Sequence, residues 1–587
     1  MKSRTSFFNG TVLRKDITRY APLWGLYTVF LIILFLSGQR EYPILTANAV
    51  ASLLGEMALF NLIYAGLIAN ILFGDLFQGR MCNALHALPL KRESWFATHV
   101  LAGLLFSFVP NIVGAVFLMF LLQEFYYMAL LWLAVTVLQF LFFFGLGVFS
   151  TMCAGNRSGM AAVYMIINLF SLLVYGLAKE VYEPLLYGIE LTLEPFQFFQ
   201  FFCPVAHLTA NELISFNYDH LNGELVNGRI TEVYSEVWGY LFAVAAIGIV
   251  LMFLGMLLYR KRKLECAGDF VAFRGLAPVF LLIFTLACGV FLYALSSVFG
   301  FAVDYVLMAI GIIVGFFAGS MLLERTVRVF SKKNFLRFAI LAVVLTASLF
   351  LTKLDPLRIT WYVPETNEIT SMQVYDDGRF HAYHYGEDTY QLSSAEEIDM
   401  FRRVHTQLMA ERGAKTDGAS HMYIHYKLKN GREVIRYYTI DEYTAAYETL
   451  RMYFSDYRYI FDTENWNEIT SSISSIDVSL SDAYYGSTEK GEPVAIAMES
   501  QTITDPAKIY QLLEAIRKDC DEGNMAQRHT YHVGEDCLGW LYLSSNIHDE
   551  DGIIIHNGDI FKDVTVYPSA VHTKAVLDQW LAEASTQ

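Results

Sequence analysis

The chain has little charge and no phosphate-binding loop of the common kind. Asp, Glu, Lys and Arg make up 17% of its 587 residues, whereas apolar side chains make up 55%. A soluble fold of this size does not need so much apolar surface, so the composition indicates a multispanning membrane protein. The dipeptide Gly-Lys is absent from the sequence, which excludes the Gly-x-x-x-x-Gly-Lys-Ser/Thr loop of many ATPases. We therefore expect no cofactor on this chain.

Cysteine and histidine are too sparsely patterned to predict a metal centre or a catalytic site. The seven cysteines form no Cys-x-x-Cys pair, and only Cys520 and Cys537 fall in the C-terminal region. A disulfide between these two is permitted outside the cell, but a reducing habitat would remove it, so both states stay open. The string His-x-Gly-Glu-Asp occurs at 384–388 and 532–536, although at non-equivalent places in the pattern. No residues are predicted as metal ligands, and no catalytic residues are nominated.

Long apolar runs dominate the first 354 residues. Runs long enough to cross about 30 Å of hydrocarbon occupy 21–38, 51–73, 96–122, 127–150, 159–179, 237–259, 276–298, 302–323 and 335–352. Nine spans with the amino terminus inside place 19 of the 23 basic residues before position 355 on the cytoplasmic side. Because basic residues near span ends stay inside, the predicted topology is N-in and C-out.

The two parts of the chain differ in net charge. Residues 1–354 hold 23 basic and 19 acidic side chains, and residues 355–587 hold 19 and 39, which gives +4 and −20. The acidic part is excluded as a nucleic-acid binder by its bulk charge. Residues 180–236 form a further acidic segment between spans five and six, with nine carboxylates and one Arg. Its aromatic first half is expected to enter the outer leaflet or to cover a pore.

Residues 1–20 mix apolar and basic side chains. This pattern predicts a helix that lies in the lipid headgroup plane. A disordered basic tail and a signal peptide are the alternatives. The signal peptide is disfavoured because no small-residue cleavage site follows and further spans do.

Residues 75–92, between spans two and three, are too polar to cross a bilayer. Apolar side chains recur there at helical spacing until Pro89, which ends the pattern because it removes a helix hydrogen bond. Arg80, Lys91 and Arg92 place the segment on the cytoplasmic side. A short amphipathic helix at the membrane edge is predicted, suited to receive force from a soluble partner.

The same segment resembles the coupling helix of type-2 ABC exporter permeases. The carboxylate Asp75 comes directly after span two, Gly-Arg follows at 79–80, and Leu-Pro-Leu-Lys-Arg precedes span three at 88–92. Cys203-Pro204-Val-Ala-His207-Leu208 is similar to a second feature of that family, a Pro-x-x-His-Leu turn between spans five and six. The resemblance covers residues 1–265.

This resemblance implies a bacterial cell-membrane transport subunit rather than an enzyme. It predicts an interfacial elbow at 1–20, a six-span core at 21–265, two copies of a separate ATPase that binds ATP and Mg²⁺, and a second permease subunit, alike or unlike. Drug, antimicrobial-peptide or lipid-like cargo is expected by analogy with the family. The residues assigned to ATPase coupling are Asp75, Phe77, Arg80, Met81, Leu85, Leu88, Pro89 and Arg92. Spans seven to nine, within 266–354, go beyond the usual six-span pattern.

Polar residues inside spans are costly and invite a functional interpretation. The candidate pathway residues are Glu56, Asn61, Asn70, Asn111, Asn168 and Asp304. Glu56 and Asp304 lie near outer span ends, where a solvated structural role competes with proton transfer, and the asparagines are also suited to hydrogen bonds between helices. Two other functions stay open: an extracellular sensor or scaffold anchored in the membrane, and a secondary transporter driven by an ion gradient.

The last 233 residues predict an extracellular α+β domain of two related modules, 355–470 and 471–587. A capping box at 394–397 opens a helix in the first module, and Thr504-Asp505-Pro506 opens another in the second at an offset of about 111 residues. Strands are expected at 422–427, 434–440, 538–543 and 564–567, and closing helices near 441–454 and 571–584. The fold class is therefore a helical membrane bundle followed by an α+β domain.

Overall fold

A computed structural model describes the chain except for residues 1–7, 40–42, 88–90, 123–124, 192, 222–223, 301–302, 377–388, 393, 411–419, 441–443, 462–465, 481–500, 526–537, 549–553 and 586–587. The chain divides into two compact units. Unit 1 contains residues 1–182 and 191–349, and unit 2 contains residues 183–190 and 350–587.

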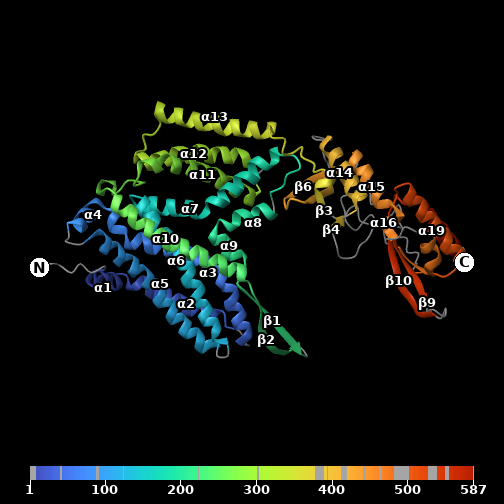
Figure 1. Cartoon of the computed structure of the whole chain (residues 1–587), viewed down its shortest axis with the longest axis horizontal. Coiled ribbons are helices and arrows are strands. Elements are labelled where there is room, and N and C mark those ends of the chain that lie inside the picture. Colours follow the sequence, from blue (N-terminus) through green and yellow to red (C-terminus); the bar gives the residue numbers. More distant parts are fainter. Residues whose placement is uncertain are drawn as a thin grey trace. The chain divides into compact units, whose positions relative to one another are not determined.

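Unit 1 is a bundle of long apolar helices (Figure 1). In the described part of the chain, eight helices are long and apolar enough to cross a membrane. They are α3 (Pro43–Leu72), α5 (Arg92–Leu122), α6 (Tyr127–Cys153), α7 (Arg157–Leu177), α10 (Ser235–Lys261), α11 (Ala277–Phe299), α12 (Asp304–Glu324) and α13 (Lys332–Leu354). Each coincides with one of the apolar runs in the sequence.

The first apolar run forms a shorter helix. It is α2 (Ala21–Ser37), and α1 (Gly10–Arg19) precedes it with a bend of 58° between them. If this bent pair is counted as one span, the described chain has up to nine candidate spans. Multi-pass character is therefore supported by length and composition.

Helix α6 lies at the centre of the bundle, where it packs against α3, α5 and α10. The rings of Phe140, Phe143 and Phe144 on α6 are fully buried. Gly145 of α6 faces Gly248 of α10 so closely that a Cβ on either would overlap the backbone of the other helix. Small residues allow this backbone approach, which is the usual way to pack helices where lipid supplies no hydrophobic drive.

Helices α11 and α12 run side by side as a tight pair (Figure 1). Gly311 and Gly315 on α12 lie against Cys288 of α11, and a Cβ at Gly311 would meet the carbonyl oxygen of Cys288. Helix α13 buries only Asn334 among its residues. Such a helix, apolar on all sides and exposed, is typical of a lipid environment.

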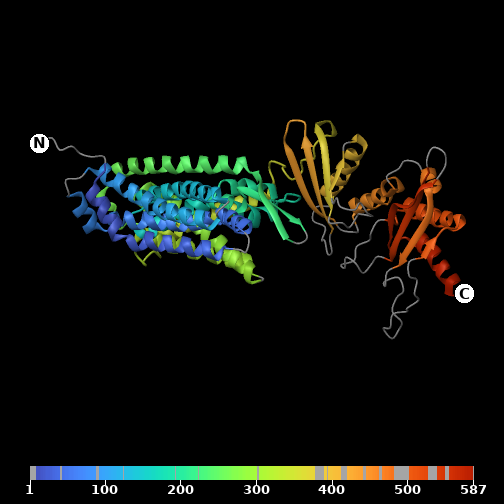
Figure 2. The ribbon, with the colours of Figure 1, turned by 90° about the horizontal axis from the view of Figure 1, so that it is seen from below.

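The segment between α7 and α10 is more ordered than the sequence indicates. It contains a π-helical turn (Ala178–Tyr182), a 3₁₀ turn (Glu183–Leu185), α8 (Leu193–Phe201) and α9 (Pro204–Ala210). A β-hairpin follows, with β1 (Ile214–Leu221) paired antiparallel to β2 (Glu224–Val233), and it extends beyond the ends of the neighbouring helices (Figures 1 and 2). The hairpin was not predicted, although Asn-Gly at 222–223 between two alternating runs is a strong hairpin signal.

The first part of unit 2 is a four-stranded antiparallel sheet in the order β4-β3-β5-β6, with helices α14 and α15 packed on it (Figure 2). The bounds are β3 (Ile369–Asp376), β4 (Thr389–Leu392), α14 (Ala395–Ala410), β5 (Ser420–Leu428), β6 (Glu433–Ile440) and α15 (Ala445–Ser455). Half of the predicted capping box is seen: Ser394 Oγ accepts from the Glu397 amide at 3.3 Å, while the Ser394 hydroxyl donates to the Glu397 carboxylate at 2.6 Å.

The second part repeats this connectivity. Its sheet has the order β10-β9-β7-β8. Read from the other end, as β8-β7-β9-β10, this is the order of the first sheet with β4, β3, β5 and β6 replaced by β8, β7, β9 and β10. The bounds are α16 (Tyr457–Phe461), α17 (Trp466–Ser472), β7 (Ile473–Leu480), β8 (Gln501–Ile503), α19 (Pro506–Asp521), β9 (Gly539–His548), β10 (Ile554–Val566) and α20 (Val571–Ser585). Strands β9 and β10 are longer than predicted, because the sequence pattern at their far ends is polar.

The two modules differ in what their helices bury. His405 of α14 is fully buried and lies between the hydroxyls of Tyr426 and Tyr438, at 2.8 and 2.7 Å. Ile516 stands at the matching place in α19 and is also fully buried. Burial lowers the pKa of His405 to about 3, so the imidazole is neutral at physiological pH.

A buried carboxylate fixes the closing helix of the second module. Asp519 of α19 accepts from the amides of His572 and Thr573, at 3.1 and 2.7 Å, and from the Thr573 hydroxyl at 2.7 Å. It thereby satisfies amides at the start of α20 that have no partner within the helix.

Candidate coupling site at the basic end of the bundle

One end of the bundle gathers most of the basic side chains of unit 1. It is formed by α1, by residues 74–92, by the α6–α7 and α10–α11 connections, and by the α12–α13 connection. We call it the basic end. The described residues among those assigned to ATPase coupling belong to it.

The expected single amphipathic helix is instead two short helices. Residues 74–77 form a 3₁₀ helix, η1 (Gly74–Phe77), and residues 79–86 form α4 (Gly79–His86). Gln78 between them is extended, with φ −112° and ψ 118°. The one-helix prediction is wrong at this point, because an extended residue interrupts the helical hydrogen-bond pattern.

The two short helices have a buried and an exposed side. Leu76, Phe77 and Cys82 are buried, with exposed fractions of 1%, 6% and 1%. Arg80 is exposed, and Met81 is 44% exposed. Asp75 is partly buried. The Leu85 side chain, Leu88 and Pro89 lie outside the described residues, so their assignment stays a prediction.

Arg262 joins η1 to two spans. It follows α10, is only 6% exposed, and donates to the carbonyl of Thr151 in α6 at 2.8 Å and to that of Leu76 in η1 at 3.3 Å. Thr151 lies in the last turn of α6, whose carbonyls have no helical partner and favour a cation. One guanidinium therefore holds η1, the end of α6 and the end of α10 together.

Neighbouring side chains reinforce this connection. Arg92 at the start of α5 lies over the ring of Tyr259 in α10, 6.0 Å from its centroid. Arg260 pairs with Glu93 at 3.1 Å. Burial raises the pKa of the Cys82 thiol, and the guanidinium of Arg262 acts in the opposite direction. Helix α4 also packs against η5 (Leu264–Cys266) in the α10–α11 connection.

The α10–α11 connection is paired with the α6–α7 connection. Ala154 and Val271 form an antiparallel bridge. The Ala272 amide donates to the Cys153 carbonyl at 2.7 Å, and the Gly268 amide donates to the Gly155 carbonyl at 2.6 Å. The basic end is thus a single hydrogen-bonded layer across the ends of several spans.

Helix α1 is fixed to the start of α5. The Asp16 carboxylate of α1 lies 3.5 Å from Nε2 of His99 in α5, and both side chains are buried. The Asn9 amide donates to the Thr98 hydroxyl at 2.9 Å. A helix bent away from α2 and pinned at its side fits the expected elbow at residues 1–20, of which residues 8–20 are described.

The candidate pathway residues do not form one common site. Asn61 donates to Gln139 of α6 at 3.0 Å, and Asn111 donates to Tyr27 of α2 at 3.1 Å. Asn168 donates to the Tyr164 carbonyl within its own helix at 2.9 Å. These three asparagines are fully or nearly fully buried. Their amides join neighbouring helices or brace their own helix.

Of the other three pathway candidates, Asn70 and Asp304 lie near the ends of helices. Glu56 was expected near an outer span end but lies in the interior of α3 (Pro43–Leu72), because the helix begins before the apolar run does. Asn70 donates to the Arg157 carbonyl at 3.1 Å near the basic end. Glu56 is exposed on α3. Asp304 at the start of α12 accepts from Ser296 at 2.5 Å. Glu56 lies on α3 and Asp304 on α12, so these two carboxylates do not together form a buried proton relay.

The Pro-x-x-His-Leu turn forms the short helix α9. Pro204 occupies its first turn, and Cys203 and Leu208 are fully buried. A Cβ at Gly55 of α3 would meet the Leu208 carbonyl oxygen at 2.8 Å. The turn is therefore packed closely on α3 at Gly55, in the half of that helix farther from η1.

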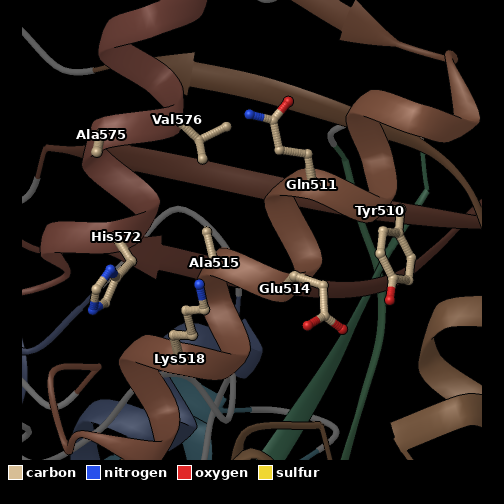
Figure 3. Close-up of a pocket in the computed structure, with 8 residues that line it drawn as sticks. All are labelled: Tyr510, Gln511, Glu514, Ala515, Lys518, His572, Ala575 and Val576. Atoms are coloured by element: carbon tan, nitrogen blue, oxygen red, sulfur yellow. The ribbon is translucent and has the colours of Figure 1, made fainter.

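The C-terminal module has a shallow groove between α19 and α20 (Figure 3). Its volume is about 510 Å³, and Glu514, Lys518 and His572 supply its charged edge. His572 pairs with Glu522 at 3.1 Å, so its ring is engaged beside the groove. Cys520 is a buried thiol in the same helix, and burial raises its pKa. Cys537 lies outside the described residues, and the disulfide stays a prediction.

Sequence reasoning missed the importance of Arg262. It belongs to the run Arg260-Lys-Arg-Lys263. Four basic residues at the end of a span indicate only that this end faces the cytoplasm. Nothing in the sequence distinguishes the buried member from its neighbours. Comparisons with protein-family models, with curated proteins and with solved structures give no match for this chain.

Proposed function

We propose that this chain is the transmembrane permease subunit of an ATP-driven exporter, with hydrolysis on a separate ATPase. The observation that supports the proposal most is the contact of Arg262 with both Thr151 and Leu76. A passive anchor has no need for a small extramembrane element that is tied through one buried cation to the ends of two spans.

In this proposal the basic end faces the cytoplasm. The exposed side of α4, with Arg80 and Met81, is the docking face for the ATPase. Force applied to α4 reaches η1 and then Arg262, which pulls on the ends of α6 and α10. Because Gly145 and Gly248 keep these two helices in close backbone contact, they move as one body rather than separately.

Helix α1 supports the same mechanism. Its buried contacts with α5 hold the elbow to the span that follows the coupling segment. A second permease subunit would complete the pathway, and the acidic C-terminal modules would lie outside the cell. Cargo is proposed only as a class: a drug, an antimicrobial peptide or a lipid-like molecule, in line with the family resemblance.

The test is copurification of the full-length chain from bacterial membranes that express it, followed by Mg-ATP hydrolysis assays. The wild type should bring down a Walker-type ATPase, and the double variant Arg80→Glu, Met81→Glu should reduce its bound amount and its hydrolysis at least tenfold. Arg328→Glu is the matched control, since Arg328 is exposed on the α12–α13 connection at the same end. Equal ATPase binding by the double variant would refute the docking assignment.

Absence of an ATPase from the wild-type preparation would favour the other two functions. A transporter driven by an ion gradient would move cargo with an imposed gradient and lose activity on replacement of Glu56 or Asp304. A sensor or scaffold would show neither hydrolysis nor cargo movement.

A further inference from the structure

Strand β6 of the first module holds two segments that come directly from spanning helices. One is residues 183–190, which follow α7, and we call it the strap. The other is residues 355–362, which follow α13. The strap contacts Tyr437 and Tyr438, and the second segment contacts their neighbour Arg436, so the two segments meet three consecutive residues of β6.

The strap covers the outer edge of the first sheet. The Tyr437 amide donates to the Gly188 carbonyl at 3.2 Å. Tyr187 donates its hydroxyl to the Leu408 carbonyl at 3.2 Å, and its ring lies 5.4 Å from the ring of Tyr438. Since β6 is an edge strand, the strap supplies the kind of backbone partner that an edge otherwise seeks elsewhere.

Gly188 fixes the approach of the strap. Its φ is 76°, and a Cβ at this position would overlap the ring of Tyr438. Both the backbone conformation and the closeness require glycine. The strap is therefore fitted to β6 rather than resting loosely on it.

The second segment is held as firmly. Asp355 accepts from the amides of Ile359 and Thr360, both at 2.9 Å. Arg436, which is 6% exposed, donates to the Ile359 carbonyl at 2.9 Å. The residues after α13 thus have a defined fold, and Arg436 of β6 holds them by a hydrogen bond.

The end of α7 before the strap is fixed to other spans. Its π-helical turn, a rare form that often marks functional sites, places the Glu180 carboxylate 2.8 Å from the hydroxyl of Tyr293 on α11. Tyr305 on α12 donates to the Glu180 carbonyl at 3.2 Å. Tyr182 bonds Ser348 of α13 at 2.9 Å and is followed directly by Glu183, the first residue of the strap.

We propose that residues 178–190 are a relay between the spans and the first module. A change in the packing of α7 against α11 and α12 would shift the strap and alter β6, and a ligand that stabilises β6 would in turn favour one packing of α7. By linkage the coupling is reciprocal. This inference goes beyond the proposed transport function, because it requires neither ATP nor cargo.

The test is hydrogen exchange, read by mass spectrometry, on the full-length chain in lipid nanodiscs. Tyr293→Phe removes the hydroxyl that reaches Glu180 on the span side. It should speed exchange of the β6 amides 436–438 about tenfold, which is the factor for loss of one hydrogen bond to a charged carboxylate at the lower limit. Tyr240→Phe is the matched control, since Tyr240 donates to the Phe201 carbonyl and touches neither the π-helical turn nor the strap.

The reverse direction uses glycine variants. Gly188→Ala should speed hydrogen exchange of the backbone amides of residues 178–182 about fivefold, which is the factor for loss of one hydrogen bond between uncharged groups. Gly431→Ala is its control, because Gly431 also has a positive φ, 79°, but nothing lies within 4 Å of its Cβ position. If Gly188→Ala unfolds the first module, which faster exchange throughout α14 would reveal, Tyr187→Phe replaces it and carries the same expected result.

Two outcomes would overturn the relay. One is unchanged β6 exchange in Tyr293→Phe. The other is an equal change in a variant and its control. Since no ATPase enters the measurement, failure here is distinguishable from failure of the proposed transport function.

Discussion

Replacement of Arg262 by Met tests whether one cation holds η1 to the spans. Met keeps most of the length of the side chain but makes neither hydrogen bond. A hydrogen bond to a charged group contributes about 1.5–3 kcal/mol, and the bond to Leu76 at 3.3 Å is long. Only the bond to Leu76 attaches η1, so we take the lost attachment as about 1.5 kcal/mol, the lower limit for one such bond. This is a fraction of a typical stability of about 5–15 kcal/mol, so local detachment of η1 and α4 is expected rather than global unfolding.

The assay is the maleimide labelling rate of Cys82, which is 1% exposed, in a chain whose other cysteines are replaced. A loss of about 1.5 kcal/mol corresponds to roughly a tenfold higher population of the detached state. The labelling rate should rise by up to that factor. Arg260→Met is the matched control, because Arg260 is half-exposed and pairs only at the surface with Glu93.

The sign of the result is decisive. Arg262 lowers the pKa of Cys82 against the larger effect of burial, so its removal from an otherwise unchanged structure would leave less thiolate and slow the labelling. A slower or unchanged rate in Arg262→Met would refute the clamp. A faster rate in both variants would show a general loosening of the basic end.

Three further predictions concern stability. His405 stays neutral in the folded module until about pH 3, whereas in the unfolded chain it binds a proton below about pH 6.5. The free energy of unfolding of the first module should therefore fall by up to about 1.4 kcal/mol per pH unit as the pH drops below 6.5. Hydrogen exchange of α14 should show this slope in the wild type and not in His405→Gln. Gly311→Val should cost roughly 1–3 kcal/mol by overpacking and lower the thermal midpoint of the detergent-solubilised chain, while Gly239→Val on α10, with nothing within 4 Å of its Cβ position, should not. Asp519→Ala should cost about 1–3 kcal/mol through the unsatisfied amides of α20, seen as faster exchange at 571–575, and the exposed Asp521→Ala should leave that exchange unchanged.

Much of the fold could be predicted because its signals are local. A span needs a continuous apolar run, and each of the nine runs lies on a helix of the structure. The helices α14 and α19 were predictable from capping residues, and Asp505 indeed accepts from the Ala507 amide at 3.0 Å. Predictions failed where two signals competed, as at Gln78, where helical spacing continues through a residue with extended backbone.

By itself the sequence determined which stretches are apolar enough to span, where the basic residues gather, and that the C-terminal region repeats a helix-and-strand pattern. These properties depend on residues close together in the chain. Only the tertiary structure decided which of four adjacent cations is buried, and that Gly188 lies against Tyr438 some 250 residues later in the chain. Such contacts depend on close approach between distant segments, where hydrogen-bond geometry and excluded volume select the partner, and neither is encoded in local hydropathy.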